Sequence, residues 1–454
     1  MSQKKVLKRE LIVNGNLFKV ILVLSLPLVL KNVIQAFYQI IDTFFSDNIG
    51  ENGLSAISFI TPIMGFVLAI GAAISVAVTA MVARYLGKQS IKEARSTVIN
   101  ALLISGIVAI TITALGFIFS YQIIRLLQAA DSYARLASLY FRYSLLSLPL
   151  VFFGNIYFGY KSARGETLSL MIISVFGMTI KLTLSIIMIN LNLGVLGLGL
   201  ATLISHAVIM IIAAIDLFIV KSEYQINFND LKLKKNILLP FTILMLPILV
   251  ERTSLNFSHI IVNMFITPLD PAVLAAYGLT NKVNTLIFAV PTALGAALIT
   301  IVGQNLTAGN LKKCSKAIYA SIGLGIGISV VLLIILYSFQ EPIIRMFTSD
   351  VQTISYTKDA MNVFSHTAIA WTFMQVAIGV FYAAGYSYYP IIISVSRLFL
   401  FRIPALWIML TFTNLNEFSI WYGMLIANIL AAILSIVLLL RIKWQQTPKY
   451  LENI

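Results

Sequence analysis

The sequence contains few of the residues on which soluble enzymes, disulfide-rich proteins and metal proteins depend. Only 11% of the 454 residues are charged, whereas a soluble domain carries about 25%. The single cysteine, Cys314, excludes a disulfide framework and a cysteine-based metal cluster. Three histidines lie far apart and predict no metal site, and no Gly-x-x-x-x-Gly-Lys-Ser/Thr loop for ATP is present. We therefore expect a protein that is not an enzyme and has no cofactor.

Apolar residues are present in excess. They make up 59% of the chain, and the mean hydropathy is +0.94. A helix needs about 20 mostly apolar residues to cross a bilayer. The sequence therefore predicts an all-α polytopic membrane protein with about twelve transmembrane helices. Runs of that length lie at about 17–47, 53–84, 96–120, 132–163, 167–190, 196–221, 236–267, 272–305, 314–340, 354–385, 388–413 and 418–442.

The charge balance is strongly basic, with 32 Lys and Arg against 17 Asp and Glu. In a soluble protein this excess would suggest nucleic acid. Here the basic residues gather after the even-numbered runs, as at Arg84, Lys88, Lys234, Lys313 and Arg441. Positive residues stay on the cytoplasmic side of a membrane. We therefore expect a multi-pass protein of the cell (inner) membrane with both termini in the cytoplasm, and no nucleic-acid partner.

The two halves of the sequence resemble each other at one constant offset. The offset that takes Pro27 to Pro247 also takes Lys92 to Lys312, without a gap. Each repeat holds an even number of helices, so both insert in the same orientation, and such parallel repeats are common in transporters. The pattern predicts two six-helix lobes, residues 1–220 and 237–454, joined by a cytoplasmic linker at residues 221–236.

Several motifs resemble those of multidrug and toxic compound extrusion (MATE) transporters. They are Gln-Ile-Ile-Asp-Thr-Phe-Phe at 39–45, Val-Ala-Arg-Tyr-Leu-Gly at 82–87, Leu-Pro at 246–247 followed by Glu251, and Gly-Gln-Asn-Leu at 303–306. The resemblance implies an exporter that moves small organic compounds outwards in exchange for H⁺ or Na⁺ by alternating access. We expect the protein to be a monomer. The alternative is a flippase for a lipid-linked saccharide or other amphiphile, which the surplus of internal Lys and Arg leaves open.

The resemblance also implies a cation-coupling site in the first lobe. Asp42, Tyr38, Asn155 and Thr202 match the family's pattern. The family's Asn and Asp on helix 5 are replaced, because the sequence has Lys181 and Ser185 there. A lysine ammonium could neutralise Asp42 in place of a bound Na⁺. Three interpretations remain open: a static ion pair, a pair that breaks when Asp42 is protonated, or a lysine that contacts substrate.

In the second lobe, Glu251 lies one helical turn after Pro247 and matches a frequent acid of the family. A proline inside a helix removes a backbone hydrogen bond and kinks the helix. That suits a coupling acid whose surroundings rearrange. The rival interpretation is a structural ion pair with Arg252 or Lys282.

The substrate cavity is predicted from aromatic and basic residues inside apolar runs. The candidates are Phe152, Phe153, Tyr382, Arg397 and Arg402. Internal Lys and Arg outnumber internal acids, so a cavity lined by these residues would suit neutral or anionic compounds. The alternative is that the arginines cap backbone carbonyls or reach lipid headgroups.

Overall fold

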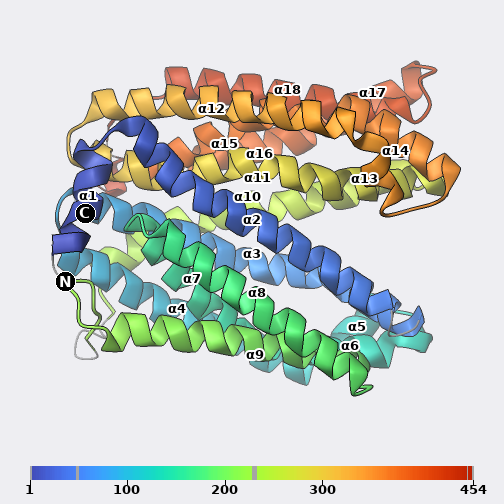
Figure 1. The fold of residues 1–454 in the computed structure, drawn as a ribbon, viewed down its shortest axis with the longest axis horizontal. Helices are drawn as coiled ribbons and strands as arrows, with labels where there is room; N and C mark the ends of the chain where they lie inside the picture. The colour runs from blue at the N-terminus through green and yellow to red at the C-terminus, as the bar shows by residue number, and fades with distance from the viewer. Residues whose placement is uncertain (1–2, 48–50, 228–232, 447, 452–454) are drawn as a thin grey trace. The chain divides into compact units, whose positions relative to one another are not determined.

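The computed structural model describes residues 3–47, 51–227, 233–446 and 448–451 (Figure 1). The side chains of 3–8, 37–47, 51, 52, 54, 58 and 449 lie outside this description. Every regular element in the described ranges is a helix. Eleven of these helices are long and apolar enough to cross a membrane, and one bent pair makes a twelfth span if it is counted as one. The prediction of an all-α membrane protein with about twelve spans is therefore confirmed.

The chain forms two compact units. Unit 1 contains residues 1–10 and Ile34–Leu249, and unit 2 contains Leu11–Val33 and Val250–Asn453. Two long helices, α2 (Leu17–Asp47) and α10 (Lys235–Ile266), therefore contribute one half to each unit. The division of the chain at residues 221–236 describes the sequence repeat, and as a boundary between lobes it stays a prediction.

The same order of helices occurs twice. The first set is α3 (Glu51–Gly87), α4 (Ile91–Ile118), α5 (Ser120–Leu126), α6 (Asp131–Leu146), α7 (Leu148–Ala163), α8 (Thr167–Asn190), α9 (Gly194–Ala214) and the π-helix η1 (Ile215–Ile219). The second set is α11 (Pro271–Thr307), α12 (Leu311–Ser338), α13 (Gln340–Arg345), α14 (Val351–Phe364), α15 (Thr367–Ala384), α16 (Tyr388–Val395), the π-helix η3 (Ser396–Arg402), α17 (Ile403–Phe412) and α18 (Phe418–Arg441). Helix α1 (Gln3–Asn14) precedes the first set, and the short η4 (Lys449–Leu451) follows the second. The offset between Pro27 and Pro247 also separates the first residues of α3 and α11, of α4 and α12, and of α6 and α14, so the two-lobe repeat is confirmed.

Two runs that the sequence presents as single helices are broken in the structure. The run at 132–163 is divided into α6 and α7, which meet at Ser147 with a bend of 41°. Pro149 stands in the first turn of α7, where its missing N–H costs no helical hydrogen bond. The run at 354–385 is divided at Ser365 and His366 into α14 and α15. Both breaks occur at the same place in the repeat.

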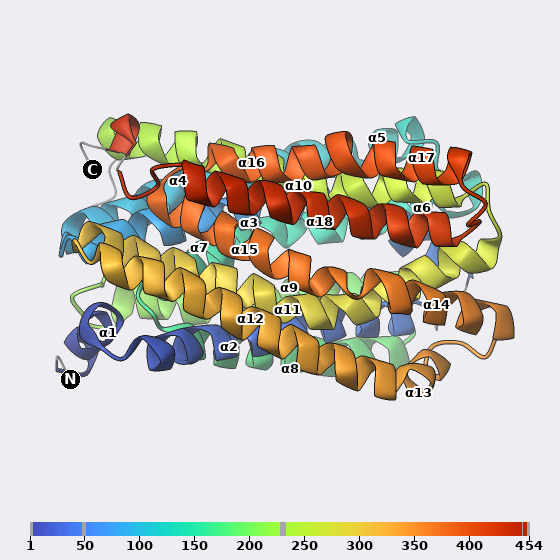
Figure 2. The same ribbon diagram turned by 90° about the horizontal axis from the view of Figure 1, so that it is seen from above.

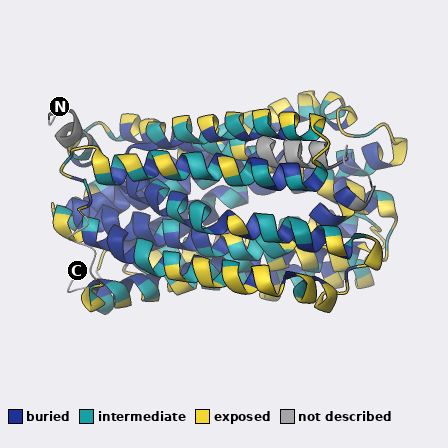
Figure 3. Ribbon diagram, turned by 90° about the horizontal axis from the view of Figure 1, so that it is seen from below, coloured by how far each residue is buried: buried dark blue, intermediate teal, exposed yellow. Residues whose placement is uncertain are grey.

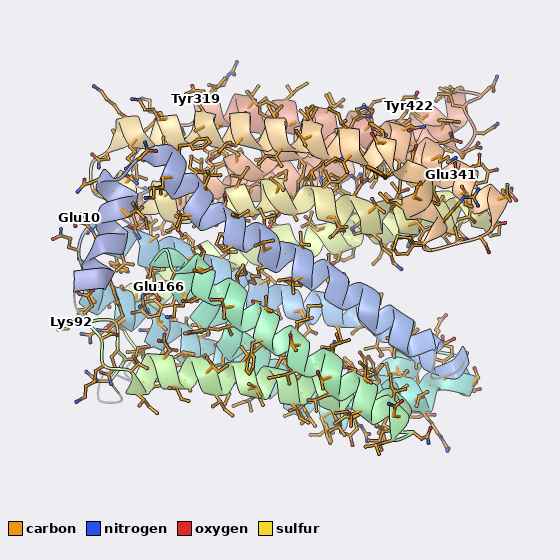
Figure 4. All side chains as sticks on the ribbon, viewed as in Figure 1. Glu10, Lys92, Glu166, Tyr319, Glu341 and Tyr422 are labelled. Atoms are coloured by element: carbon orange, nitrogen blue, oxygen red, sulfur yellow. The ribbon has the colours of Figure 1, made fainter. Side chains whose placement is uncertain are left out.

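The short helix α13 lies between two spans and carries an exposed ion network. Arg345 and Lys358 both donate hydrogen bonds to the Glu341 carboxylate. These bonds, that from Lys358 first, hold the pKa of Glu341 at about 2, below its ordinary 4.5. Within unit 2, Glu341 lies towards one end of the helices together with Tyr422, and Tyr319 lies towards the opposite end (Figure 4).

Each unit has a central helix pair in close backbone contact. A Cβ atom at Gly159 of α7 would meet the carbonyl oxygen of Ser75 in α3, and one at Gly379 of α15 would meet that of Gly295 in α11. These crossings occupy corresponding positions in the repeat. Small residues allow such close approach of membrane helices. We infer that each unit is built around one tightly packed helix crossing.

Burial divides the helices into central and peripheral ones. In an 18-residue apolar stretch of α15, 83% of the residues are buried, whereas the corresponding share in α8 is 17%. Exposed apolar side chains such as Ile107, Ile110 and Ile118 line the outer face of α4. Figure 3 shows buried and exposed faces alternating along single helices. An exposed apolar face of a spanning helix is the surface that lipid covers.

The residues between α1 and α2 are fastened to unit 2 by hydrogen bonds. Lys313 Nζ donates to the carbonyl oxygens of Val13, at 2.9 Å, and Gly15, at 2.7 Å. Asn305 Nδ2 donates to the carbonyl oxygen of Ile12 at 3.2 Å. These contacts explain why residues 11–33 belong to unit 2 although they come first in the sequence.

Candidate functional site

A group of polar side chains lies inside unit 2 and is called here the unit 2 polar cluster. Its members come from α10, α15, α16, η3 and α18, and they are Glu251, Arg252, Ser258, Tyr382, Ser394, Arg397, Arg402 and Asn428. Except for Arg252, all are buried, with relative exposures of 4% or less. Polar groups inside a membrane protein are costly and are typically functional. The cluster is therefore the first candidate for a site.

Glu251 is the acid of the cluster. Its side chain is 2% exposed, the Tyr382 hydroxyl donates to Oε2 at 3.1 Å, and the Ser394 hydroxyl lies 3.5 Å from Oε1. Arg252 Nε stands 3.3 Å from the same Oε2, and its side chain is 28% exposed. The predicted pairing with Arg252 is therefore present, and Lys282 is absent from the described ion pairs of Glu251. The carboxylate has a counterion and two hydroxyl neighbours.

The sequence of α10 explains why Glu251 stands at a flexible place. Pro240 and Pro247 both lie inside the helix. Each lacks the N–H that would bond to the carbonyl four residues earlier, so the helix has fewer hydrogen bonds in the turn before Glu251. The boundary between the residues of unit 1 and unit 2 also falls here, after Leu249. A charge change at Glu251 therefore acts on a weakened part of the helix.

Arg397 and Arg402 are brought together by a local change of helix type. They lie in η3, a π-helix that joins α16 to α17 in one continuous run (Figure 2). In an α-helix, positions i and i+5 are about 140° apart around the axis. The i→i+5 bonding of a π-helix places such residues about one turn apart along the same side. Pro404 follows directly and cannot donate to the helical ladder, which favours the irregular turn.

The two arginines have different surroundings, although each is only 4% exposed. Arg402 Nη1 donates to the Ser258 hydroxyl, and its Nη2 donates to Asn428 Oδ1 at 3.1 Å. The Arg397 guanidinium lies over the ring of Trp371, 5.1 Å from its centre. Within the described residues Arg397 makes no hydrogen bond, and the buried Nε atoms of both arginines have no acceptor.

The predicted site of the first lobe is described only in part. The side chains of Asp42 and Tyr38 lie outside the described residues. Lys181 and Ser185 of α8 are buried, 4% and 1% exposed. His206 of α9 lies close enough to Lys181 to interact with its charge. The structure thus places a lysine inside unit 1, as the sequence predicts, and its pairing with Asp42 stays a prediction.

The other predicted residues of unit 1 have helix-packing contacts. Thr202 donates to the carbonyl oxygen of Leu198 within α9 at 3.0 Å. Asn155 and Phe152 of α7 both border Gly71 of α3, where an added Cβ would meet their side chains. Phe152 is 1% exposed, and Phe153 is half-buried. Their roles in cation coupling and in the substrate cavity stay predictions.

A buried ion network at one end of unit 1 was not foreseen from the sequence. Lys161 Nζ lies 2.7 Å from Glu166 Oε2 and 2.8 Å from Asp216 Oδ2. Arg164 pairs with the other oxygen of Glu166 and lies over the ring of Tyr224, 4.2 Å from its centre. Burial raises the pKa of Tyr224 to about 12, with the charge of Glu223 adding to the shift. Glu166 lies towards the same end of unit 1 as Lys92 (Figure 4).

Residue type explains which parts of the sites the sequence could indicate. Charged residues in apolar runs, such as Glu251, Arg397 and Arg402, are visible in the sequence. Ser258 and Ser394 are ordinary residues of membrane helices and carry no signal. Asn428 stands alone in an apolar span and could have been singled out. In the described part of the chain, no group of three His, Cys, Asp or Glu residues could hold a metal ion.

A comparison with protein families gives two matches to one family model. The model, described as MatE, matches residues 27–187 and 247–408. The two matches begin at the repeat-related prolines Pro27 and Pro247, so they are separated by the same offset as the two sets of helices. Together they cover most of the described spans.

Comparison with individual proteins gives relatives over most of the chain. The probable multidrug resistance protein YoeA of Bacillus subtilis is 21% identical over 412 residues, which are 87% of this chain and 88% of that protein. A FAD transporter of Shewanella oneidensis is 23% identical over 343 residues, 74% of this chain and 76% of that protein. A crystal structure of MATE in complex with MaL6 has a TM-score of 0.91 and 22% identity, covering 95% of this chain and 97% of that one. This structural likeness shows the same fold.

Proposed function

The chain belongs to the MatE family, whose members are transporters and not enzymes, and we propose that it exports small organic compounds in exchange for H⁺ or Na⁺ by alternating access. The relatives support export, since one is named a probable multidrug resistance protein. The FAD transporter indicates that relatives at similar identity carry different kinds of organic compound. The near full-length match to a MATE fold favours an exporter over the flippase that the composition leaves open.

The observation that carries the proposal is the environment of Glu251. The carboxylate is 2% exposed, beside an arginine and a tyrosine hydroxyl, on a helix weakened by Pro240 and Pro247. Protonation of Glu251 would cancel its attraction to Arg252 and change the acceptor of the Tyr382 hydrogen bond. Binding or release of one cation is thereby linked to the conformation of α10. This link is what an ion-coupled transporter requires.

The first lobe supports a coupling site without bound Na⁺. Lys181 brings a positive charge to the place where the family pattern has Asn and Asp. A lysine that neutralises Asp42 would leave H⁺ as the cation that can exchange there. We therefore propose H⁺ for the first lobe and leave Na⁺ to be tested at Glu251.

The coupling proposal is tested in proteoliposomes. Dye efflux is measured with Na⁺ and H⁺ gradients imposed independently, for the wild type, Glu251→Gln and the control Glu341→Gln. The control removes an acid of the same unit that is 44% exposed. Glu251→Gln should lose gradient-driven efflux and still exchange dye without a gradient. Efflux that needs neither gradient would refute the coupling, and loss of folded protein in Glu251→Gln alone would make Glu251 a structural partner of Arg252.

The pairing of Asp42 with Lys181 is tested by a double-mutant cycle. Removing one member of a buried ion pair costs about 3–5 kcal/mol, so Asp42→Asn and Lys181→Ala should each destabilise the protein. The double variant should be more stable than either single variant. If it also transports, the pair is static; if it folds without coupling, the pair switches. Additive effects would show that the side chains do not meet, and that Lys181 contacts substrate.

A further inference from the structure

We infer that Arg397 and Arg402 form an anion-binding site inside unit 2, and that it receives the carboxylate or phosphate group of an organic anion carried by the protein. The inference deepens the proposed export function, because it names a chemical class of cargo. The binding step itself does not depend on which cation drives transport.

The charges of the unit 2 polar cluster do not balance. Three guanidinium groups stand against the single carboxylate of Glu251, and that carboxylate is paired with Arg252. Among the described ion pairs, none includes Arg397 or Arg402. Both lie in the middle of the span 388–412. An unpaired charge in such a place is costly, so buried charges in membrane proteins normally have a partner. An anion is the partner that would balance these two.

Several hydrogen-bond donors of the arginines also lack acceptors. A guanidinium group carries five N–H donors. Arg402 uses two nitrogens to bond Ser258 and Asn428, and its buried Nε is unpaired. Arg397 bonds no described residue and rests on the face of Trp371. Arg402 is thus held in place with a donor unused, and the Arg397 guanidinium has no hydrogen-bond acceptor among the described residues. That group matches carboxylate and phosphate oxygens in a two-bond arrangement.

The repeat gives the two arginines different counterparts in the first half. The corresponding helices α8 and α16 begin at Thr167 and Tyr388, one residue further apart than the starts of the earlier helix pairs, so the counterparts are Phe176 and Lys181. Arg402 thus corresponds to another buried cation, whereas Arg397 stands where the first half has an apolar side chain. The charge of Arg397 is therefore an addition to the second half, and a ligand gives a reason for it that the shared packing does not.

Binding is measured on the purified protein in detergent, without any gradient. Benzoate, benzamide and benzamidine share one ring and differ in charge, from −1 through 0 to +1. Trp371 lies beside Arg397 and serves as the fluorescent reporter, and Trp371→Phe identifies its share of the signal. Benzoate should bind at least tenfold more tightly than the other two compounds, and it should raise the thermal unfolding midpoint, because a ligand stabilises the folded state that binds it.

Variants locate the site. Arg397→Gln and Arg402→Gln should each weaken benzoate binding at least tenfold, and Arg397→Lys should retain part of the binding. The control Arg441→Gln, at an exposed arginine of the same unit, should leave benzoate binding unchanged. If the glutamine variants do not fold, the wild-type series and Arg397→Lys still decide the question. Equal binding of benzamidine and benzoate, or benzoate binding that survives in folded Arg397→Gln, would overturn the inference.

Two further results separate the possible explanations. Displacement of benzoate by phosphatidylglycerol in mixed micelles would overturn the assignment to a soluble cargo, because the site would then hold a lipid headgroup. A protein that binds benzoate but shows no ion-coupled efflux would contradict the proposed coupling and leave the anion site intact. A protein that couples dye efflux to a gradient but does not bind benzoate would contradict the anion site alone.

Discussion

Replacing Tyr382 by phenylalanine removes one hydroxyl from the unit 2 polar cluster and tests the hydrogen bond that this hydroxyl donates to Glu251. The hydroxyl donates to Glu251 Oε2 at 3.1 Å, and both side chains are at most 2% exposed. A hydrogen bond to a charged group contributes about 1.5–3 kcal/mol. We therefore expect Tyr382→Phe to lower the free energy of unfolding by about 1.5–3 kcal/mol and to slow gradient-driven dye efflux.

The expected loss follows from the burial of the pair. A buried carboxylate that loses a hydrogen bond inside the protein has no water to replace it, so the folded protein is destabilised. The other groups facing Glu251 are Arg252, Ser394 and, at longer range, Arg397, and the substitution leaves them in place.

The assay is the thermal unfolding midpoint of the purified protein, with dye efflux from proteoliposomes measured beside it. Tyr389→Phe is the matched control, because the Tyr389 hydroxyl bonds no described residue, although its ring packs against Phe381. The control should keep the wild-type midpoint. An unchanged midpoint in Tyr382→Phe would show that the Tyr382 hydroxyl does not stabilise Glu251, and equal losses in both variants would show an indirect effect of the ring environment.

Four further predictions concern packing, charge and topology. In a thermal unfolding assay, Gly379→Ala should destabilise the protein by about 1–3 kcal/mol, because the added methyl group meets a backbone carbonyl of the facing helix. The control Gly323→Ala, in open space on α12, should be neutral or stabilising by up to about 1 kcal/mol. Glu166→Gln should cost about 3–5 kcal/mol, because it leaves the buried Arg164 without its described acid and Lys161 with Asp216 alone. A wild-type unfolding midpoint would contradict the buried network. The pKa of Glu341 is lowered to about 2, so its contribution to stability is fully present above about pH 4.5 and is lost as the pH falls towards 2. The difference in unfolding midpoint between the wild type and Glu341→Gln should therefore vanish over that range. A cysteine introduced at Lys88 should react only with reagents that enter the cytoplasm. The background should be low because the native Cys314 is buried. Labelling from outside the cell would show that the predicted orientation in the membrane is wrong.

Long apolar runs and basic connections were sufficient to predict the fold from the sequence. Lipid excludes unsatisfied backbone groups, so a run of about 20 apolar residues has few alternatives to a helix. The offset between the halves could be read from Pro27 and Pro247 because it stays constant as far as the start of α6 and α14. The break at Ser147 was missed, since the polarity of residues 132–163 does not change where the helix bends.

The sites were only partly predictable. Glu251, Arg397 and Arg402 are conspicuous as charges among apolar residues. Their partners depend on which helices meet, and hydroxyl residues such as Ser394 are too common in spans to indicate a contact. The π-helix that aligns the arginines was also hidden, because an α-helical pattern places positions 397 and 402 on different faces. Long-range packing and local departures from α-helical geometry are therefore the parts that sequence periodicity does not contain.

The exchange of helix halves between the units has a consequence for how the protein is made. Residues 12–15 receive their hydrogen bonds from Asn305 and Lys313, which follow them by 293 to 300 positions. Ribosomes add about 5–20 residues per second, so the donor residues are synthesised on the order of 15–60 s after these carbonyl groups. During that interval the first half of α2 is inserted without its neighbours in unit 2. A nascent chain that stops at residues 221–236 holds this half of α2 without those neighbours, so release at that point should yield a substrate for membrane quality control.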